Sequence, residues 1–127
     1  MPQGGETGPQ GGEAGMLKER LRRHLIGLAQ GGNFTTYREL ALQLGLRPPQ
    51  TIRQVTALLE TLMAEDAEAG RPLLAAICVG RLRGDLPAAG FFLTAEELGL
   101  YEGAPEGPQA REFHLKELGR LFAFYRE

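Results

Sequence analysis

Few residues in this 127-residue chain have the types and spacing needed for covalent or acid–base chemistry. The chain has one cysteine, Cys78, and two histidines, His24 and His114, which are far apart in the sequence. No histidine lies beside Cys78 to activate its thiol, and there is no CxxC, HExxH or GxSxG pattern and no glycine-rich phosphate loop. We therefore expect no enzymatic activity, no metal and no cofactor. We interpret Cys78 as a small buried residue and His24 as a partly buried packing residue.

The distribution of the arginines fits a different chemistry, the binding of phosphate groups. The net charge of −2 does not favour a polyanionic partner, and seven glutamates follow Thr94. Residues 16–60 are nevertheless basic, and residues 71–90 add Arg71, Arg81 and Arg83 against Asp85. Local charge sets the field that a phosphate meets, so weak, salt-dependent binding is compatible with this sequence; a solvated surface of mixed charge is the alternative. The charged residues of 16–60 are Lys18, Arg20, Arg22, Arg23, Arg38, Arg47 and Arg53 against Glu19, Glu39 and Glu60.

The elements that must position these arginines are two helices joined by a short turn, over residues 34–55. Thr36 followed by Glu39 forms a capping box, which marks the start of a helix. Gly45 suits a left-handed stop at its end. Two prolines then favour the first turn of a new helix from Thr51. This pattern predicts a helix-turn-helix, whose second helix can enter the major groove of DNA, although many such helix pairs bind no nucleic acid.

The second helix of this pair is predicted to be long, ending at Gly70. Glu65, Asp66 and Glu68 lie in its last turns, where the negative pole of the helix dipole disfavours them. We therefore expect this end to fray or to contact a partner. The predicted apolar stripe of the helix is Ile52, Val55, Leu58, Leu59, Leu62 and Met63.

The remaining segments complete the predicted fold. Residues 1–15 are rich in glycine and should form a disordered tail, and residues 16–29 should form an amphipathic helix. The apolar run 72–79 predicts a buried strand, and 91–93 would return as a second strand or anchor the loop between them in the core. Thr94 and Glu97 indicate a further capping box, and an aromatic helix should start at Pro108.

These elements predict an α+β, mostly helical domain over residues 16–127, with a winged helix-turn-helix core and an additional C-terminal helix. The loop 81–90 would be the wing, because its Arg, Gly, Asp and Pro residues are typical of an exposed loop or hairpin. Duplex DNA would then meet the start of the second helix and this loop. The expected DNA-binding residues are Tyr37, Arg47, Gln50, Thr51, Arg53, Gln54, Arg81 and Arg83.

From Thr35 to about Phe92, the sequence resembles the C-terminal winged-helix domain of the alkylguanine-DNA alkyltransferases and their catalytically inert alkyltransferase-like relatives. TTYRELA is similar to the family's TYGELA and IRQV to its ARAVG, and PLLAAICVGRLRGDLP stands where the family has PCHRVV and a glycine-containing loop. The resemblance implies that Tyr37 crowds a phosphate beside the target nucleotide and that Arg53 enters the stack in place of a flipped base. Leu73 occupies the position of the nucleophilic cysteine, which excludes alkyl transfer by the family's mechanism.

The function expected from the sequence is therefore non-catalytic binding of duplex DNA, in regulation or in DNA-damage sensing. The alternative is a protein-interaction module that uses the apolar and acidic C-terminal half. No apolar run approaches the roughly 18 residues that span a bilayer, and the N-terminus does not resemble a secretory signal. We therefore expect no membrane association and a cytoplasmic location, with which the lack of a possible disulfide agrees.

Overall fold

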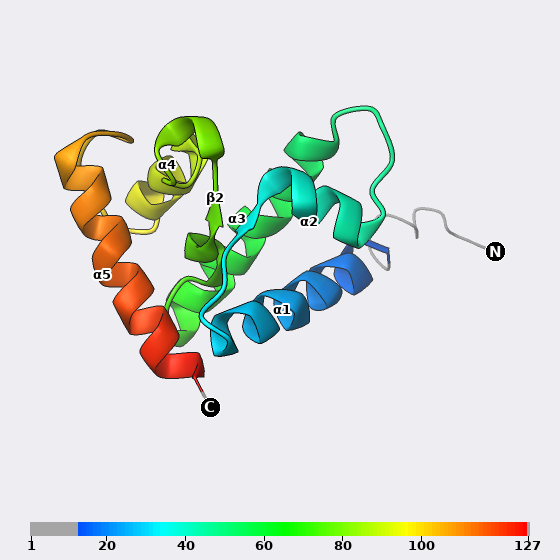
Figure 1. Cartoon of the computed structure of the whole chain (residues 1–127), viewed down its shortest axis with the longest axis horizontal. Coiled ribbons are helices and arrows are strands. Elements are labelled where there is room, and N and C mark those ends of the chain that lie inside the picture. Colours follow the sequence, from blue (N-terminus) through cyan, green and yellow to red (C-terminus); the bar gives the residue numbers. More distant parts are fainter. Residues whose placement is uncertain (1–12, 127) are drawn as a thin grey trace.

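The computed structural model describes residues 13–126, so most of the predicted tail, residues 1–12, lies outside the described residues. Ala14 and Gly15 already belong to the first helix, not to the tail. Figure 1 shows α5 at one side of the molecule, the α2–α3 turn at the other, and β2 between them. The elements in chain order are α1 (Ala14–Gln30), β1 (Thr35–Thr36), α2 (Tyr37–Leu44), α3 (Thr51–Ala69), the 3₁₀ helix η2 (Leu74–Ile77), β2 (Cys78–Val79), the 3₁₀ helix η3 (Arg81–Arg83), α4 (Ala89–Glu97) and α5 (Pro108–Tyr125).

The architecture is mostly helical with one small sheet, which confirms the predicted α+β, mostly helical class. β1 and β2 pair in parallel, with Thr35 opposite Cys78 and Thr36 opposite Val79. The 3₁₀ helix η2 is fully buried and packs against α1, α3 and α5, so the core surrounds it. None of the helices in the described part of the chain is long and apolar enough to cross a membrane.

The predicted pair of helices at residues 34–55 is confirmed. The amide of Glu39 donates to Thr36 Oγ1 (3.1 Å), and the amide of Thr36 donates to Glu39 Oε1 (3.2 Å), so the capping box is complete. Gly45 ends α2 in the left-handed conformation, as expected from its lack of a Cβ. The prediction for Ile52 was wrong: it is 46% exposed, because the first turn of α3 extends beyond the core.

The apolar run 72–79 is buried as predicted, but only Cys78 and Val79 form a strand. Two carboxylates from other elements satisfy the backbone amides that a sheet neighbour would otherwise have bound. The amide of Leu73 donates to Glu117 Oε2 (2.7 Å), and the amide of Leu74 donates to Asp66 Oδ2 (3.2 Å). The backbone groups therefore have partners without a sheet, and the segment forms η2.

The predicted second strand at residues 91–93 was wrong, because these residues lie inside α4. Phe91 and Phe92 pack edge to face with centroids 5.1 Å apart and are buried, so they anchor the preceding loop in the core. Thr94 is in the middle of this helix and does not cap it; Ala88 is the N-cap residue. Residues 81–90, the predicted wing, form η3, a turn and the start of α4, with a single antiparallel bridge between Gly80 and Leu86.

Of the two outcomes predicted for the acidic end of α3, fraying is not found. Asp66 is completely buried, and its Oδ1 accepts hydrogen bonds from Arg22 Nη1 (2.7 Å) and Arg71 Nε (3.1 Å). Arg22 also bonds Glu65 through Nη2 (2.8 Å), and Lys18 pairs with the same glutamate. Cations from α1 therefore compensate the unfavourable helix dipole, and α3 ends at Ala69 followed by Gly70 in the left-handed conformation.

His114 lies in the core, where its Nε2 is 2.8 Å from the carbonyl oxygen of Ala76. A carbonyl can only accept, so Nε2 carries a proton and donates it. Burial lowers the pKa of His114, partly opposed by this hydrogen bond, and Arg111 lowers it further. The imidazole is therefore held in its neutral form.

We expect the free energy of unfolding to fall as the pH drops below about 6.5, the ordinary histidine pKa. In that range the unfolded chain binds a proton at His114 and the folded protein does not, so the unfolded state gains stability. The free energy of unfolding stops falling once the pH is below the lowered pKa of His114 in the folded state. Urea unfolding at a series of pH values measures this change. His114→Gln keeps a donor for Ala76 but does not titrate, so an equally steep decline in that variant would contradict the assignment.

Candidate nucleic-acid interface

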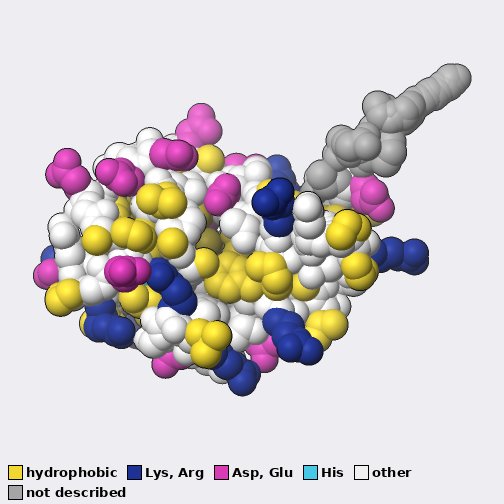
Figure 2. Space-filling model, turned by 90° about the horizontal axis from the view of Figure 1, so that it is seen from above, with side chains coloured by type: hydrophobic (Ala, Val, Ile, Leu, Met, Phe, Trp, Pro, Cys, Tyr) yellow, Lys and Arg dark blue, Asp and Glu magenta, His cyan; other side chains and the backbone are white. Residues whose placement is uncertain are grey.

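One face of the molecule carries a groove between the N-terminal ends of α2 and α3 and residues 79–82. We call it the α2–α3 groove; it encloses about 680 Å³. Figure 2 shows the molecule from above, with a central hollow lined by hydrophobic side chains and with both basic and acidic side chains around it. Its lining residues are Thr36, Tyr37, Arg38, Glu39, Leu42, Ile52, Val79, Gly80, Arg81 and Leu82.

The parallel pairing of β1 with β2 brings the two sides of this groove together. It places Val79 opposite Thr36, so the turn that follows Val79 starts beside the first turn of α2. The turn is closed by a hydrogen bond from the Gly80 amide to the Leu86 carbonyl (2.8 Å). Arg81 and Leu82 therefore project from a closed turn, and the Arg81 side chain is 80% exposed.

Five of the eight predicted site residues cluster at the start of α3. Arg47 and Arg53 are exposed, and neither side chain makes a hydrogen bond or ion pair within the described residues. Gln54 has a structural role instead, because its side-chain amide donates to the carbonyls of Arg47 and Pro49 (3.0 Å each) and braces the turn. Gln50 is the N-cap residue, and no side chain caps the amides of this helix start. Thr51 is the first residue of α3 and is partly buried.

Gln50 adopts a left-handed backbone conformation with φ 61° and ψ 42°. For a residue with a Cβ this conformation costs roughly 1–2 kcal/mol, so the surrounding turn holds it there. Such strained positions are often found at binding sites. The side chain of Gln50 is exposed at the point where the chain enters α3.

Two predicted site residues are engaged in interactions within the protein. Tyr37 Oη accepts a hydrogen bond from the Ala88 amide (2.8 Å), and burial raises the pKa of Tyr37 above its ordinary value. Arg83 donates from Nε to the Pro87 carbonyl (3.1 Å) and from Nη2 to the Pro105 carbonyl (2.6 Å). The structure thus uses both side chains to fix the turn and the start of α4, and leaves Arg81 as the exposed cation of the turn.

Sequence reasoning did not select Arg38, Leu42 and Leu82 as site residues, although all three line the α2–α3 groove. Arg38 and Leu42 are four residues apart on α2, so helical spacing alone would have placed them on one face. Leu82 stands between two arginines in a polar loop, where an apolar residue is unexpected. Both signals were present in the sequence.

Glu39 is the acidic residue in the lining of the α2–α3 groove. One of its oxygens serves in the capping box, and the other lies 3.9 Å from Arg81 Nη2. A pair this exposed and this long is worth little in free energy. Arg81 therefore remains available to an incoming anion.

Cys78 follows η2 and forms β2 with Val79, behind the groove. Cys78 is completely buried, and burial raises the pKa of its thiol well above the ordinary range, so the nucleophilic thiolate is disfavoured. The cavity beneath Tyr37, bounded also by Thr56, Ala88 and Phe91, has a volume of about 10 Å³. That space holds about one water at most and cannot admit a nucleobase.

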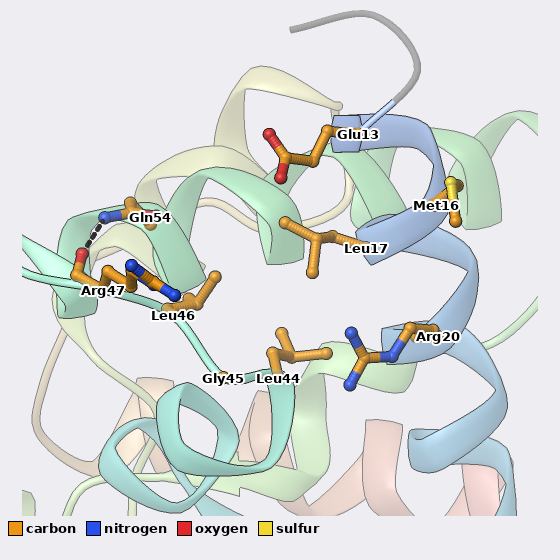
Figure 3. Close-up of a pocket in the computed structure, with 9 residues that line it drawn as sticks. All are labelled: Glu13, Met16, Leu17, Arg20, Leu44, Gly45, Leu46, Arg47 and Gln54. Atoms are coloured by element: carbon orange, nitrogen blue, oxygen red, sulfur yellow. Dashed lines mark hydrogen bonds between the residues drawn. The ribbon is translucent and has the colours of Figure 1, made fainter. Parts of the chain in front are cut away.

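A second hollow, of about 870 Å³, lies between the start of α1 and the α2–α3 turn. Figure 3 shows Leu17, Leu44 and Leu46 pointing into it, with the guanidinium groups of Arg20 and Arg47 at its sides. Arg20 Nη2 donates to the carbonyl at Gln43 (3.3 Å). The start of α3 is therefore flanked by arginines on both sides, Arg47 in this hollow and Arg38 in the α2–α3 groove.

Comparison with known proteins found no matching family model, no matching curated protein and no matching solved structure.

Proposed function

We propose that this protein binds duplex DNA without catalysis, as a winged-helix type of protein in which the start of α3 meets the duplex. The observation that carries the proposal is the set of exposed arginines around that helix start. The guanidinium groups of Arg38, Arg47 and Arg53 have no partner within the described residues, and that of Arg81 has only a long contact to Glu39. Unpaired guanidinium groups on one helix-turn-helix are suited to several phosphates at once.

In this proposal α3 enters the duplex with its first turn, where Gln50, Thr51 and Arg53 reach the bases or the adjacent phosphates. The uncapped amides of this turn and the positive helix dipole add to the attraction for a phosphate. The short turn 80–86 takes the place of a wing and brings Arg81 to the backbone. Binding is weak to moderate and depends on salt, because it rests on few cations in a chain of net charge −2.

The resemblance to the alkyltransferase-like proteins supports a regulatory or damage-sensing role. Arg53 in the second helix would stabilise an unstacked site, as the resemblance implies. The buried thiol of Cys78 and the leucine at position 73 agree with binding in the absence of alkyl transfer. Tyr37 differs from the expectation, because its hydroxyl accepts the Ala88 amide and would reach a phosphate only as a second interaction.

Titration of a labelled random-sequence duplex at several salt concentrations tests the proposal. Arg53→Ala and Arg81→Ala should each weaken binding and reduce the salt slope by about one unit, because each removes one phosphate contact. Lys116→Ala is the matched control: it removes one exposed cation from α5 and should leave the slope unchanged.

Two results would count against the proposal in different ways. If the wild-type protein binds no tighter than about millimolar at low salt, it is weaker than ordinary non-specific association and the DNA hypothesis fails. If the wild type binds and Arg53→Ala is indistinguishable from it, the interface lies elsewhere on the surface.

The second candidate function is a protein-interaction module. The sequence analysis expected its surface in the C-terminal half, and Leu93 and Leu115 are exposed residues of that half. The α2–α3 groove adds Leu42 and Ile52 as exposed apolar residues. A partner held by such contacts would stay bound at salt concentrations that release DNA, which separates the two functions experimentally.

A further inference from the structure

Leu82 is the most exposed large hydrophobic residue of the described chain, with a relative exposure of 102%. A single exposed leucine is ordinary by itself, but the position of this one in the fold distinguishes it. It occupies the middle of η3, directly after Arg81, and it lines the α2–α3 groove together with Ile52 of the first turn of α3. A duplex that met the start of α3 would therefore meet Leu82 as well.

The turn that carries Leu82 is held in one conformation by several contacts. Gly80 and Leu86 form an antiparallel bridge, and Arg83 is fixed by the carbonyls of Pro87 and Pro105 and by an ion pair with Glu106 (3.6 Å). These contacts fix the turn in a conformation in which the Leu82 side chain is outside the core and exposed. A preorganised apolar tip loses little conformational freedom on binding.

We propose that Leu82 is an apolar wedge that enters the base stack of the bound duplex and opens one base step. This inference rests on the proposed function and adds a way of deforming the DNA to it. Arg81 beside the wedge and Arg38 across the groove would hold the phosphates that flank the opened step. Leucine side chains at other DNA-distorting surfaces unstack base steps in this manner, and the duplex bends as a result.

The charges around the wedge favour DNA over a protein partner. Among the charged residues lining the groove, Arg38 and Arg81 are opposed by Glu39 alone, so the lining carries a net positive charge. Leu82 also stands in the middle of the short helix η3, directly between Arg81 and Arg83. A projecting apolar tip between cations suits a stack of bases between phosphates.

The test uses the full chain and two duplexes, each with one 2-aminopurine, a base whose fluorescence rises on unstacking. One duplex carries the probe in a TA step, which opens easily, and the other in a stiff A-tract. We expect the wild type to raise the fluorescence of the TA duplex and to bind it on the order of tenfold more tightly than the A-tract. Leu82→Ala should lose both effects while binding both duplexes equally, and Leu82→Met should retain them.

Leu115→Ala is the matched control, because Leu115 is an exposed leucine on α5. Leu115→Ala should bind and unstack the duplexes as the wild type does. Leu82→Ala should have the same Tm as the wild type, because the Leu82 side chain is fully exposed. Two results would overturn the wedge but not the proposed function. In one, the wild type binds the duplexes without a change in fluorescence; in the other, the fluorescence change persists in Leu82→Ala. If the wild type binds neither duplex, the proposed function fails, and the wedge fails with it.

Discussion

Replacing Asp66 with alanine is expected to lower the free energy of unfolding by about 3–5 kcal/mol, the typical effect of breaking a buried ion pair from one side. Asp66 has no exposed surface, and it binds Arg22, Arg71 and the Leu74 amide. The variant leaves the mostly buried Arg22 guanidinium without its Asp66 partner and removes the acceptor of a buried amide. The expected fall in Tm is roughly 10–20 °C for a domain of this size.

Urea unfolding of the wild type and the variant measures the change, and Glu65→Ala provides the control. Glu65 binds the same Arg22, but its side chain is partly exposed, so its removal should cost no more than about 1 kcal/mol. The double variant Arg22→Ala with Asp66→Ala should be less destabilised than the sum of the two single variants, because no charge remains buried alone. An Asp66→Ala effect as small as that of Glu65→Ala would refute the structural role of the buried carboxylate.

Replacing Phe92 with alanine is expected to cost about 3–5 kcal/mol, the usual range for a buried phenylalanine. Phe92 is 1% exposed. Its ring lies 5.1 Å from Phe91, 5.5 Å from Tyr101 and 6.4 Å from Phe113 between centroids. The variant therefore removes one buried member of an aromatic cluster that joins α4 to α5 and to the linker between them.

The neighbouring residue Leu93 is the control for this prediction. It lies in the same helix but is exposed, so Leu93→Ala should change the stability by about 0.5 kcal/mol or less. Denaturant unfolding monitored by far-UV circular dichroism gives both values. An unchanged m-value would show that the variant exposes the same surface area on unfolding as the wild type. Equal effects of the two substitutions would mean that the aromatic cluster does not stabilise the attachment of α4.

Local signals in the sequence predicted the helices well where the interacting residues are neighbours. The Thr36–Glu39 capping box, the left-handed Gly45 and the end of α3 at Gly70 were predicted correctly, because each depends only on residues within one or two turns. The same reasoning failed at Thr94, which has the same spacing to Glu97 but lies inside a helix that starts at Ala89. Burial of Phe91 and Phe92 extends that helix toward the N-terminus, and the capping pattern cannot reveal this.

The other failures come from contacts between residues far apart in the chain. Residues 72–79 were predicted to be a strand because nothing near them indicates that Asp66 and Glu117 bind their amides. At the candidate site, the sequence selected exposed Arg47, Arg53 and Arg81 from their local charge. It also selected Arg83, whose acceptors at Pro87 and Pro105 are visible only in the folded protein.

The charges of the fold are separated along the molecule, which gives it an electric dipole moment. Residues 89–107 contain four glutamates and no lysine or arginine, whereas the start of α3 carries Arg47 and Arg53. Figure 1 places α4 and the α2–α3 turn on opposite sides of β2. In the field of a polyanion the molecule would rotate during its approach, so that the start of α3 leads and the acidic linker trails. Screening at physiological salt acts over about 8 Å, much less than the roughly 28 Å length of the 19-residue helix α3, so this torque operates only in the last stage of an encounter.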